Sequence, residues 1–495
     1  MLKEIYTWGK QNPGAIFKWS LFLCLIYFPI FIDLDVLPLR IWDETRLANN
    51  AYEMYKNGNY LVTYFQGMPE LWNTKPPLMI WLQVLCMKTI GVGELAVRLP
   101  SAIAALLTCI LIMLFAVRYL KSFWWGFGAV LVLVTTHGYI NMHAARSGDY
   151  DALLTLFTTF YCLSFYLYAI AGKNKYLTWT FIGLTLAVLT KGIAGLLFLP
   201  ALGIFFIIKG SIPALFRNKT FYINIAIFLV ITLGYYLLRE HYNPGYLNAV
   251  FKYELGGRYF KTLENHQHEF WFYYHNFIDF QFTYWYLFIP AGVVIGLANK
   301  NAQISNFTLY ITLLFVTFFL IISNGKTKLQ SYDVPMYPFM ALIIGGLLHF
   351  FLSLLEKVEN ISSLKSSSLQ YLSIVFLFLY PYKNIIAETY SPDESLQDTE
   401  FYQIGRYLKD AVRGERNLDN QHLLYEGYYF QNLFYTYILN DKGEKIDIVQ
   451  QLNFKKGDKV IVCQQDMEDI LNAKYWCLPM DTIKNIRTYQ IDSAK

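Results

Sequence analysis

The sequence predicts a membrane protein built from many α-helices, with a small α/β domain at its C-terminal end. Hydrophobic residues make up 55% of the 495 residues and charged residues only 16%, whereas soluble proteins contain about 25% charged residues. Long apolar runs recur between Ser20 and Pro381, as in a chain that crosses a bilayer repeatedly. After residue 384 the chain becomes polar and mixes short helix-like and strand-like patterns.

The N-terminal segment predicts a first membrane helix that is not cleaved. Lys3, Lys10 and Lys18 precede and flank an apolar run over 20–32, a pattern that signal peptides share. No small-residue cleavage site follows the run. Because basic flanks stay in the cytoplasm, we expect this helix to begin there and to end on the outer side.

Ten further apolar stretches predict membrane spans, which makes eleven with the first helix. The stretches cover residues 99–117, 123–140, 152–170, 176–190, 193–208, 221–238, 283–298, 305–323, 334–352 and 369–382. The apolar stretch 77–90 is short for a span, so we interpret it as an interfacial helix inside a long outer loop, residues 33–98. The basic residues of the short loops then fall on the cytoplasmic side. A full span at 77–90 would put Asp43 and Asp151 on opposite sides.

This scheme brings four polar segments to the outer face, at residues 33–98, 141–151, 239–282 and 323–333, with the turn 190–192 beside them. It divides the chain into a membrane domain, residues 1–384, and an outer α/β domain, residues 385–495. Patterns in the outer domain predict strands at 423–425, 446–449 and 460–462 and helices at 400–412 and 467–472.

Charge and cysteine content exclude some classes of function. The net charge of +5 is spread over loops without a basic arm or stripe, so we expect no nucleic-acid partner. Four cysteines lie in or beside apolar segments and are expected to be buried. Cys463 and Cys477 lie in the polar tail, and they can pair only if the tail is outside the cytoplasm. No CxxC pair or histidine cluster predicts a structural zinc site.

The stretch Asp43-Glu44-Thr45-Arg46 puts two carboxylates and a guanidinium at a membrane surface. The helical spacing of the apolar residues that follow predicts a helix beginning near Asp43. A carboxylate at the membrane edge is partly desolvated, which raises its pKa toward the range of a general base. The alternative for Asp43 is a structural ion pair with Arg46, one helical turn away.

Five groups of residues, in the same order along the chain, resemble the motifs of one family. They are DETRLA at 43–48 with NGNY at 57–60 and KPP at 75–77, AR at 145–146 with DALL at 151–154, LTKG at 189–192 with LP at 199–200, NHQH at 265–268 with FWFYY at 270–274, and KLQSY at 328–332 with Pro335 and Pro338. The family is the aminoarabinose (lipid A) transferase and protein O-mannosyltransferase group of GT-C membrane glycosyltransferases. The resemblance extends from residue 1 to about 350, and the tail is similar in position and size alone.

The resemblance implies a GT-C fold and an inverting transfer of a sugar from a polyprenyl-phosphate donor. The acceptor is a lipid such as lipid A, a protein or a polysaccharide, at the periplasmic face of a bacterial inner membrane. On this interpretation Asp43 is the general base, Glu44 orients the acceptor or a neighbouring group, and Arg46 binds substrate.

The leaving phosphate needs cationic partners. Lys75, Lys191, Arg258 and Lys328 all fall on the outer face in this topology, and Lys326 is a near neighbour of Lys328. Snorkelling from an interfacial helix is the alternative for Lys75. Lys191 stands alone between two apolar runs, where a charge is costly unless it has a function.

Three further residues complete the predicted site. Asp151 is expected to contact the acceptor or the sugar. The alternatives are a helix-capping role for Asp151 and Asp149 as the relevant acid. His268 binds metal or substrate, or is a hydrogen-bonded structural residue. Tyr332 binds phosphate or belongs to an aromatic belt, and the aromatic run 270–274 is expected to pack at the interface.

Two departures from the family argue against its divalent metal. The aminoarabinose transferases have a Glu before the Lys-Pro dipeptide, where this chain has Thr74, and a His after a Glu in a later loop, where it has Leu255. The sequence therefore leaves a divalent metal open, without two of the family's ligands, and predicts no other cofactor.

Two other classes of function remain open. A transporter or flippase of a lipid-linked substrate would place ionisable residues at mid-membrane on broken helices, whereas the spans here contain few charges. The protein could also be an inactive relative that serves as an accessory subunit. Thr74 favours this interpretation, and the presence of Asp43, Lys75 and Lys191 argues against it.

Overall fold

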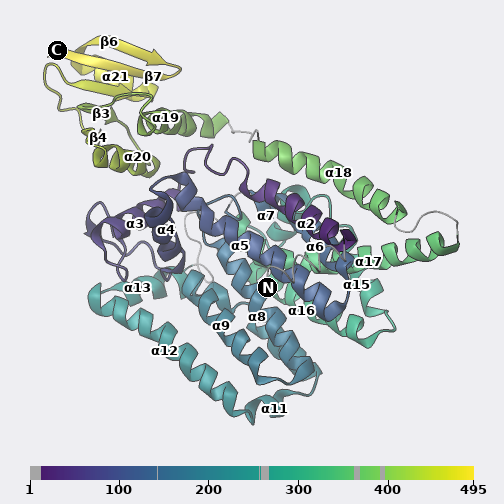
Figure 1. Cartoon of the computed structure of the whole chain (residues 1–495). Helices are drawn as coiled ribbons and strands as arrows, with labels where there is room; N and C mark the ends of the chain where they lie inside the picture. The colour runs from purple at the N-terminus through teal and green to yellow at the C-terminus, as the bar shows by residue number, and fades with distance from the viewer. Residues whose placement is uncertain (1–12, 142, 256, 258–266, 362–367, 391–395) are drawn as a thin grey trace.

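A bundle of long helices makes up most of the molecule, and a β-sheet with three helices lies at one end (Figure 1). The computed structural model describes residues 13–495 apart from 142, 256, 258–266, 362–367 and 391–395. Arg258, predicted to bind substrate, lies outside the described residues.

Six helical segments are long and apolar enough to cross a membrane. They are α5 with η1 (Glu94–Leu120), α8 (Asp151–Ala171), α9 with η2 (Asn174–Leu196), α12 (Lys219–Tyr242), α16 (Ala302–Asn324) and the segment Gln330–Leu355, which joins η5 (Gln330–Met336) to α17 (Tyr337–Ile361). The apolar helices α2 (Pro13–Phe31), α4 (Leu78–Ile90), α6 (Phe123–Val134), α10 (Leu199–Ile208) and α15 (Phe288–Leu297) are shorter, and α18 covers Ser368–Tyr390. The protein is therefore a multi-pass membrane protein. Each predicted span contains a helix, but among the described residues six helical segments are both long enough and apolar enough to cross a membrane.

Small residues set how closely the bundle helices approach one another. A Cβ atom at Gly345 of α17 would lie 2.6 Å from the carbonyl oxygen of Trp125 in α6. A Cβ atom at Gly346 would meet the Trp125 ring at 2.7 Å. Close backbone approach at small residues is the usual way in which helices pack inside a membrane, where the hydrophobic effect gives little drive.

The first loop, residues 33–98, folds into α3 (Asp43–Asn57), a hairpin of β1 (Tyr64–Phe65) and β2 (Met68–Pro69), and α4. Helix α3 begins at Asp43, as predicted, and ends at Gly58, whose φ of 70° places it in the left-handed region that favours glycine. Leu47 and Ala51 of α3 are buried in the same cluster as Met79 of α4. The loop is therefore a packed unit.

The C-terminal sheet has five strands in the order β4-β3-β5-β7-β6. Strand β3 (Gln421–Leu424) runs parallel to β4 (Ile446–Val449) and β5 (Lys459–Val462), while β7 (Ile486–Ala494) is antiparallel to β5 and β6 (Tyr475–Ile483). Helices α19 (Leu396–Val412), α20 (Phe430–Asp441) and α21 (Gln465–Lys474) complete the unit. The three predicted strands and two predicted helices are confirmed, whereas α20, β6 and β7 were not predicted. Cys463 and Cys477 are not bonded to each other.

Helix α20 joins this unit to the first loop (Figure 1). The Tyr435 hydroxyl donates to Glu94 Oε1 at 2.8 Å and accepts from the Leu39 amide at 2.9 Å. The Tyr52 hydroxyl of α3 donates to Asp441 Oδ2 at 2.6 Å. Polar groups between 341 and 396 positions apart in the chain are thus satisfied by one another in a mostly buried contact.

Candidate active site

Asp43 lies at the start of α3, on the wall of a cavity of about 820 Å³. Its carboxylate is half-buried. The residue before it, Trp42, has a φ of 71°, a conformation that non-glycine residues rarely adopt. The Tyr428 hydroxyl donates to the Trp42 carbonyl at 2.9 Å, and the two rings lie 4.4 Å apart. The C-terminal unit thus helps to hold the turn that presents Asp43.

The wall of this first cavity is built from segments that are distant in sequence. It is formed by Trp42, Asp43, Arg46 and Trp72 of the first loop, Gly138 and His143 between the bundle helices, His268, Phe272 and Gln281 of a later loop, residues 328–331 and Val334, and Tyr428 and Phe430 of the C-terminal unit. The structure therefore brings the predicted residues Asp43, Arg46, His268 and Lys328 together.

Glu44 does not line either of the two cavities that hold the predicted residues. Its carboxylate accepts hydrogen bonds from Arg98 Nε at 2.8 Å and from the Gly148 amide at 2.7 Å, and it is almost fully buried. Burial alone would raise the pKa of Glu44, but the charge and hydrogen bonds of Arg98 lower it overall. Because both oxygens are occupied by protein groups, the geometry favours the second of the two expected roles, the orientation of a neighbouring group. Through the Gly148 amide, Glu44 positions the segment that carries Asp149.

Gly148 is needed where that segment meets α5. A Cβ atom at Gly148 would lie 2.4 Å from Val97 Cγ1 and 2.9 Å from the Val97 carbonyl oxygen. Only a glycine permits this approach, which brings the next residue, Asp149, toward Asp43.

Arg46 is paired with a different acid from the one considered in the sequence. Its guanidinium forms an ion pair with Glu70 and stacks on the Phe65 ring at 3.7 Å. It also lies 4.8 Å from the ring of Phe430. The alternative in which Asp43 serves mainly as the ion-pair partner of Arg46 is therefore not what the structure contains.

Four other predicted residues line a second cavity of about 130 Å³: Lys75, Asp151, Lys191 and Tyr332. Lys191 Nζ donates to Asp151 Oδ1 at 2.5 Å and lies 5.2 Å from the centre of the Tyr332 ring. Lys75 Nζ lies 3.7 Å from Glu254 Oε1. One side of this cavity is apolar and is formed by Ile193, Ala194, Leu197, Phe318, Ile321 and Ile322.

The helical turn η5 separates the two cavities. Ser331 and Val334 face the first cavity, whereas Tyr332 and Pro335 face the second. The first cavity thus holds the Asp43 carboxylate among aromatic and polar side chains, and the second holds two lysines, each with a carboxylate partner, among apolar side chains.

Lys328 and His268 lie on the side of Asp43. Lys328 Nζ donates to the carbonyls of His268 at 2.9 Å and Gly325 at 2.7 Å. Partial burial and the charge of Lys326 lower the pKa of Lys328. The His268 ring stacks on Phe272 at 4.1 Å. The structure therefore separates Lys328 from Lys75 and Lys191, with which the sequence interpretation grouped it.

The residues at the family's metal position do not fit a metal. Thr74 Oγ1 donates a hydrogen bond to Glu254 Oε1 at 2.7 Å, so a hydroxyl donor stands where the family has a carboxylate. Leucine, at position 255, has no ligand atom. Positions 74 and 255 thus lack the two ligands that the family's metal would need, as the sequence indicated.

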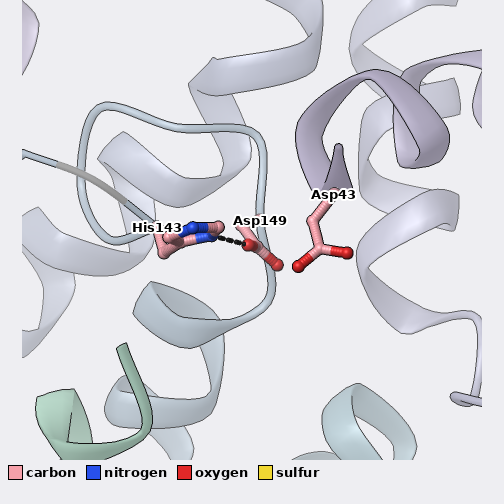
Figure 2. A group of neighbouring side chains, drawn as sticks. All are labelled: Asp43, His143 and Asp149. Carbon is pink, nitrogen blue, oxygen red and sulfur yellow. Dashed lines mark hydrogen bonds and ion pairs between the residues drawn. The ribbon is translucent and has the colours of Figure 1, made fainter. Parts of the chain in front are cut away.

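His143 is a residue of the first cavity that sequence reasoning missed, and Asp149 was considered only as an alternative to Asp151. His143 Nδ1 lies 2.5 Å from Asp149 Oδ2, and the Asp43 carboxylate faces the pair (Figure 2). Burial lowers the pKa of His143, but the hydrogen bond and charge of Asp149 raise it overall. Burial raises the pKa of Asp149, but His143 brings it down to about 2.

No local pattern marks these missed residues. A lone histidine in a polar junction carries no spacing signal, and its φ of 62° is visible only in the structure. Tyr428 and Phe430 reach the cavity from a part of the chain that the motifs do not cover.

Comparison with solved structures identifies the architecture. ArnT from Cupriavidus metallidurans, solved with undecaprenyl phosphate, matches with a TM-score of 0.67 over 97% of this chain and 98% of that one, at 15% sequence identity. The oligosaccharyltransferase AglB from Archaeoglobus fulgidus, solved with an inhibitory peptide and a dolichol-phosphate, matches with a TM-score of 0.53 over 98% of this chain and 75% of that one, at 10% identity.

The chain has a GT-C fold. The family described as dolichyl-phosphate-mannose-protein mannosyltransferase matches residues 74–236. A protein of Proteus mirabilis named undecaprenyl phosphate-alpha-4-amino-4-deoxy-L-arabinose arabinosyl transferase 1 is 28% identical over 391 residues, which are 77% of this chain and 67% of the relative. A similarly named protein of Pseudomonas fluorescens is 24% identical over 76% of this chain and 62% of its own length. The resemblance to the aminoarabinose transferase and protein O-mannosyltransferase group is confirmed.

Proposed function

We propose that this GT-C protein is an inverting glycosyltransferase that moves a sugar from an undecaprenyl-phosphate-type donor to an acceptor hydroxyl or amine. The observation that carries the proposal is the pair of adjoining cavities. One presents the half-buried Asp43 carboxylate, and the other presents two lysines, each paired with a carboxylate, beside apolar side chains.

The second cavity suits the donor. Lys75 and Lys191 supply positive charge for a phosphate, and ammonium groups with little solvent around them interact strongly with an anion. The apolar wall that includes Ile193 and Phe318 suits a polyprenyl chain. This assignment agrees with the ligands of the solved relatives, undecaprenyl phosphate and dolichol-phosphate.

The first cavity suits the acceptor. The acceptor atom attacks the anomeric carbon of the sugar as the bond from that carbon to the phosphate oxygen breaks, and Asp43 takes the acceptor proton. The leaving polyprenyl phosphate keeps the bonding electrons and a new negative charge, which Lys75 and Lys191 stabilise. Arg46 and Tyr428, at the wall of the same cavity, are in place to contact a bulky acceptor.

The acceptor is lipid A, a protein or a polysaccharide, and 4-amino-4-deoxy-L-arabinose is the sugar that the names of the curated relatives favour. We place the enzyme in a bacterial inner membrane with eleven spans, with residues 1–384 as the membrane domain. The site and the domain of residues 385–495 then face the periplasm. The positive charges of the short loops support this orientation.

Lipid and glycan mass spectrometry of cells tests the proposal. Cells that express the Asp43→Ala variant should lose one glycan product that wild-type cells make, at equal levels of protein in the membrane. Asp35→Ala changes an exposed acid of the same loop and is the matched control. An unchanged profile in the Asp43→Ala cells would remove the role proposed for Asp43.

A further inference from the structure

A polar groove of about 500 Å³ lies between the first loop and the C-terminal unit. Its wall is formed by Gln66 of the hairpin, by one side of α20, and by strand β4 with Gln450 and Gln451, which follow that strand. Helix α20 lies between β4 and α3 and contacts both (Figure 1). The groove is thus built by two parts of the chain that are distant in sequence.

The polar groove and the first cavity share one short segment, residues 428–430. Tyr428 and Phe430 line the first cavity, whereas Tyr429 between them lines the groove. The rings of Tyr429 and Phe430 lie 5.4 Å apart. A chain-like molecule whose end lies in the first cavity can therefore continue across this segment into the groove.

Hydrogen bonds fix the two sides of the groove relative to each other. Gln66 Nε2 donates to the Tyr429 hydroxyl at 2.9 Å. Glu53 of α3 accepts from the Gly67 amide at 2.9 Å and from the Tyr437 hydroxyl at 3.0 Å. The hairpin tip is therefore held against α20, and the groove has a defined shape.

The side chains in the groove suit an uncharged ligand with many hydroxyl groups. Four amides and two tyrosines line it: Gln66, Asn440, Gln450, Gln451, Tyr429 and Tyr437. An amide side chain both donates and accepts hydrogen bonds, and an aromatic ring presents a negative face to the C–H groups of a sugar ring. Among the described residues that line the groove, none is basic. A neutral sugar fits this set better than a phosphorylated one.

The edge of the sheet in the groove is unsuited to a peptide strand. Strand β4 is an edge strand, and the Asn440 amide already bonds the Ile446 carbonyl at 2.9 Å and the Ile446 amide at 3.1 Å. Because orientation alternates along a strand, Ile448 is the other residue of β4 whose backbone groups point away from β3. One such residue is too little for an added strand, but its amide and carbonyl can bond sugar hydroxyls.

We propose that the polar groove binds the sugar residues of a neutral glycan chain whose end lies in the first cavity. The inference rests on the proposed function and narrows it, because it makes the acceptor an oligosaccharide or a polysaccharide. The groove lies outside the cavity that holds Asp43. It therefore adds affinity for long acceptors and takes no part in the chemistry.

Retention of oligosaccharides on the full-length protein, immobilised in lipid nanodiscs, tests the inference. The probes are neutral oligosaccharides, from disaccharides to octasaccharides, released by mild acid from the surface polysaccharides of the bacterium that carries the gene. We expect affinity to rise at least about tenfold from the shortest to the longest probe, because added sugars occupy the groove. Gln450→Ala and Gln451→Ala should each weaken binding of the octasaccharide about three- to tenfold and leave disaccharide binding unchanged.

Matched controls separate the groove from the rest of the surface. Gln465→Ala removes an exposed amide of α21, outside the groove, and should retain every probe like the wild type. Thermal melts check that each variant is folded, and a threonine-rich decapeptide is run in parallel. Three results would overturn the inference: no retention of any oligosaccharide, equal retention in folded Gln450→Ala and Gln451→Ala, or retention of the peptide that these variants abolish.

Transfer assays distinguish failure of the inference from failure of the proposed function. With the octasaccharide as acceptor, Gln451→Ala should raise KM and leave kcat unchanged, whereas Asp43→Ala should lose turnover. Asp43-dependent transfer to a lipid or protein, without oligosaccharide retention, would leave the function standing and reject the glycan groove. Retention that depends on Gln450 and Gln451, without transfer by the wild type from a polyprenyl-phosphate sugar, would support the groove and reject the proposed function.

Discussion

Asp43 and Glu44 are adjacent carboxylates in environments that differ in every respect. Successive residues at the start of a helix point about 100° apart, so one side chain reaches the cavity while the other enters the protein interior. Asp43 is half-buried at the cavity wall, whereas Glu44 is bound by Arg98. The Asp-Glu pair thus combines a carboxylate that is open to the cavity with one that holds the loop.

Asp43→Asn should lower kcat by about 10²–10⁴-fold, the usual contribution of a general base. The amide is nearly isosteric, so KM for the donor and the melting temperature should change little. Steady-state kinetics of the purified enzyme with a polyprenyl-phosphate sugar measure both constants. Retention of more than half of the wild-type kcat would contradict the assignment.

Glu44→Gln should destabilise the protein by about 3–5 kcal/mol, because it leaves the Arg98 guanidinium buried without its counter-charge. Thermal unfolding in detergent measures the loss. Glu415→Gln, on an exposed side chain, is the matched control. The double variant Glu44→Met with Arg98→Met should recover part of the stability because it buries no unpaired charge.

The same pair predicts how stability depends on pH. The pKa of Glu44 is lower in the folded protein than its ordinary value of 4.5. The carboxylate therefore contributes its full stability above about pH 4.5, and this contribution is lost as the pH falls through the folded pKa. Melting temperatures measured between pH 7 and pH 3 should fall more steeply for the wild type than for Glu44→Gln; parallel curves would refute this.

At the scale of elements, helices α3 and α4 follow from local pattern, whereas α20, β6 and β7 do not. The segment of α20 is rich in aromatic residues, which by themselves favour strands. In the structure the segment is a helix, because this conformation buries Phe434 in the same cluster as residues of α3. Strand β6 lies at the sheet edge, is mostly exposed and contains Pro479. Such an edge strand lacks the alternation of apolar and polar residues by which strands are predicted from sequence.

Tyr435→Phe should loosen α20 from the first loop. The change removes the hydroxyl that bonds both Glu94 and the Leu39 amide, and a buried group left without a partner costs about 1–3 kcal/mol. Hydrogen exchange should speed up around Leu39 and within α20. Tyr429→Phe, which loses one exposed hydrogen bond from Gln66, is the control and should leave the exchange of both segments unchanged.

At the scale of the whole molecule, the predicted cationic residues are divided between two cavities. Lys75 and Lys328 were both expected to bind the leaving phosphate, but they line different cavities on either side of η5. Between the two cavities, η5 presents Ser331 and Val334 to the first and Tyr332 and Pro335 to the second.

Lys75→Met should weaken binding of undecaprenyl phosphate and lower kcat/KM for the donor about 10²-fold, in the range found for groups that stabilise developing negative charge. Lys328→Met should leave undecaprenyl phosphate binding unchanged, because its ammonium lies in the acceptor cavity. Fluorescence titration with a labelled lipid phosphate measures both variants. Equal losses in the two would show that the cavities do not separate donor and acceptor.

The sequence by itself determined the membrane class, the approximate positions of the apolar bundle helices, the first loop, half of the C-terminal unit and the order of the family motifs. These features depend on apolar runs, periodicity and short motifs, which are local properties of a chain. Only the tertiary structure decided that Glu44 binds Arg98, that Arg46 binds Glu70, that Lys328 is separate from Lys75, and that His143 and Tyr428 stand beside Asp43. The partners of a buried charge are chosen by packing between distant segments, because a charge excluded from water must be satisfied by whatever group the fold brings to it.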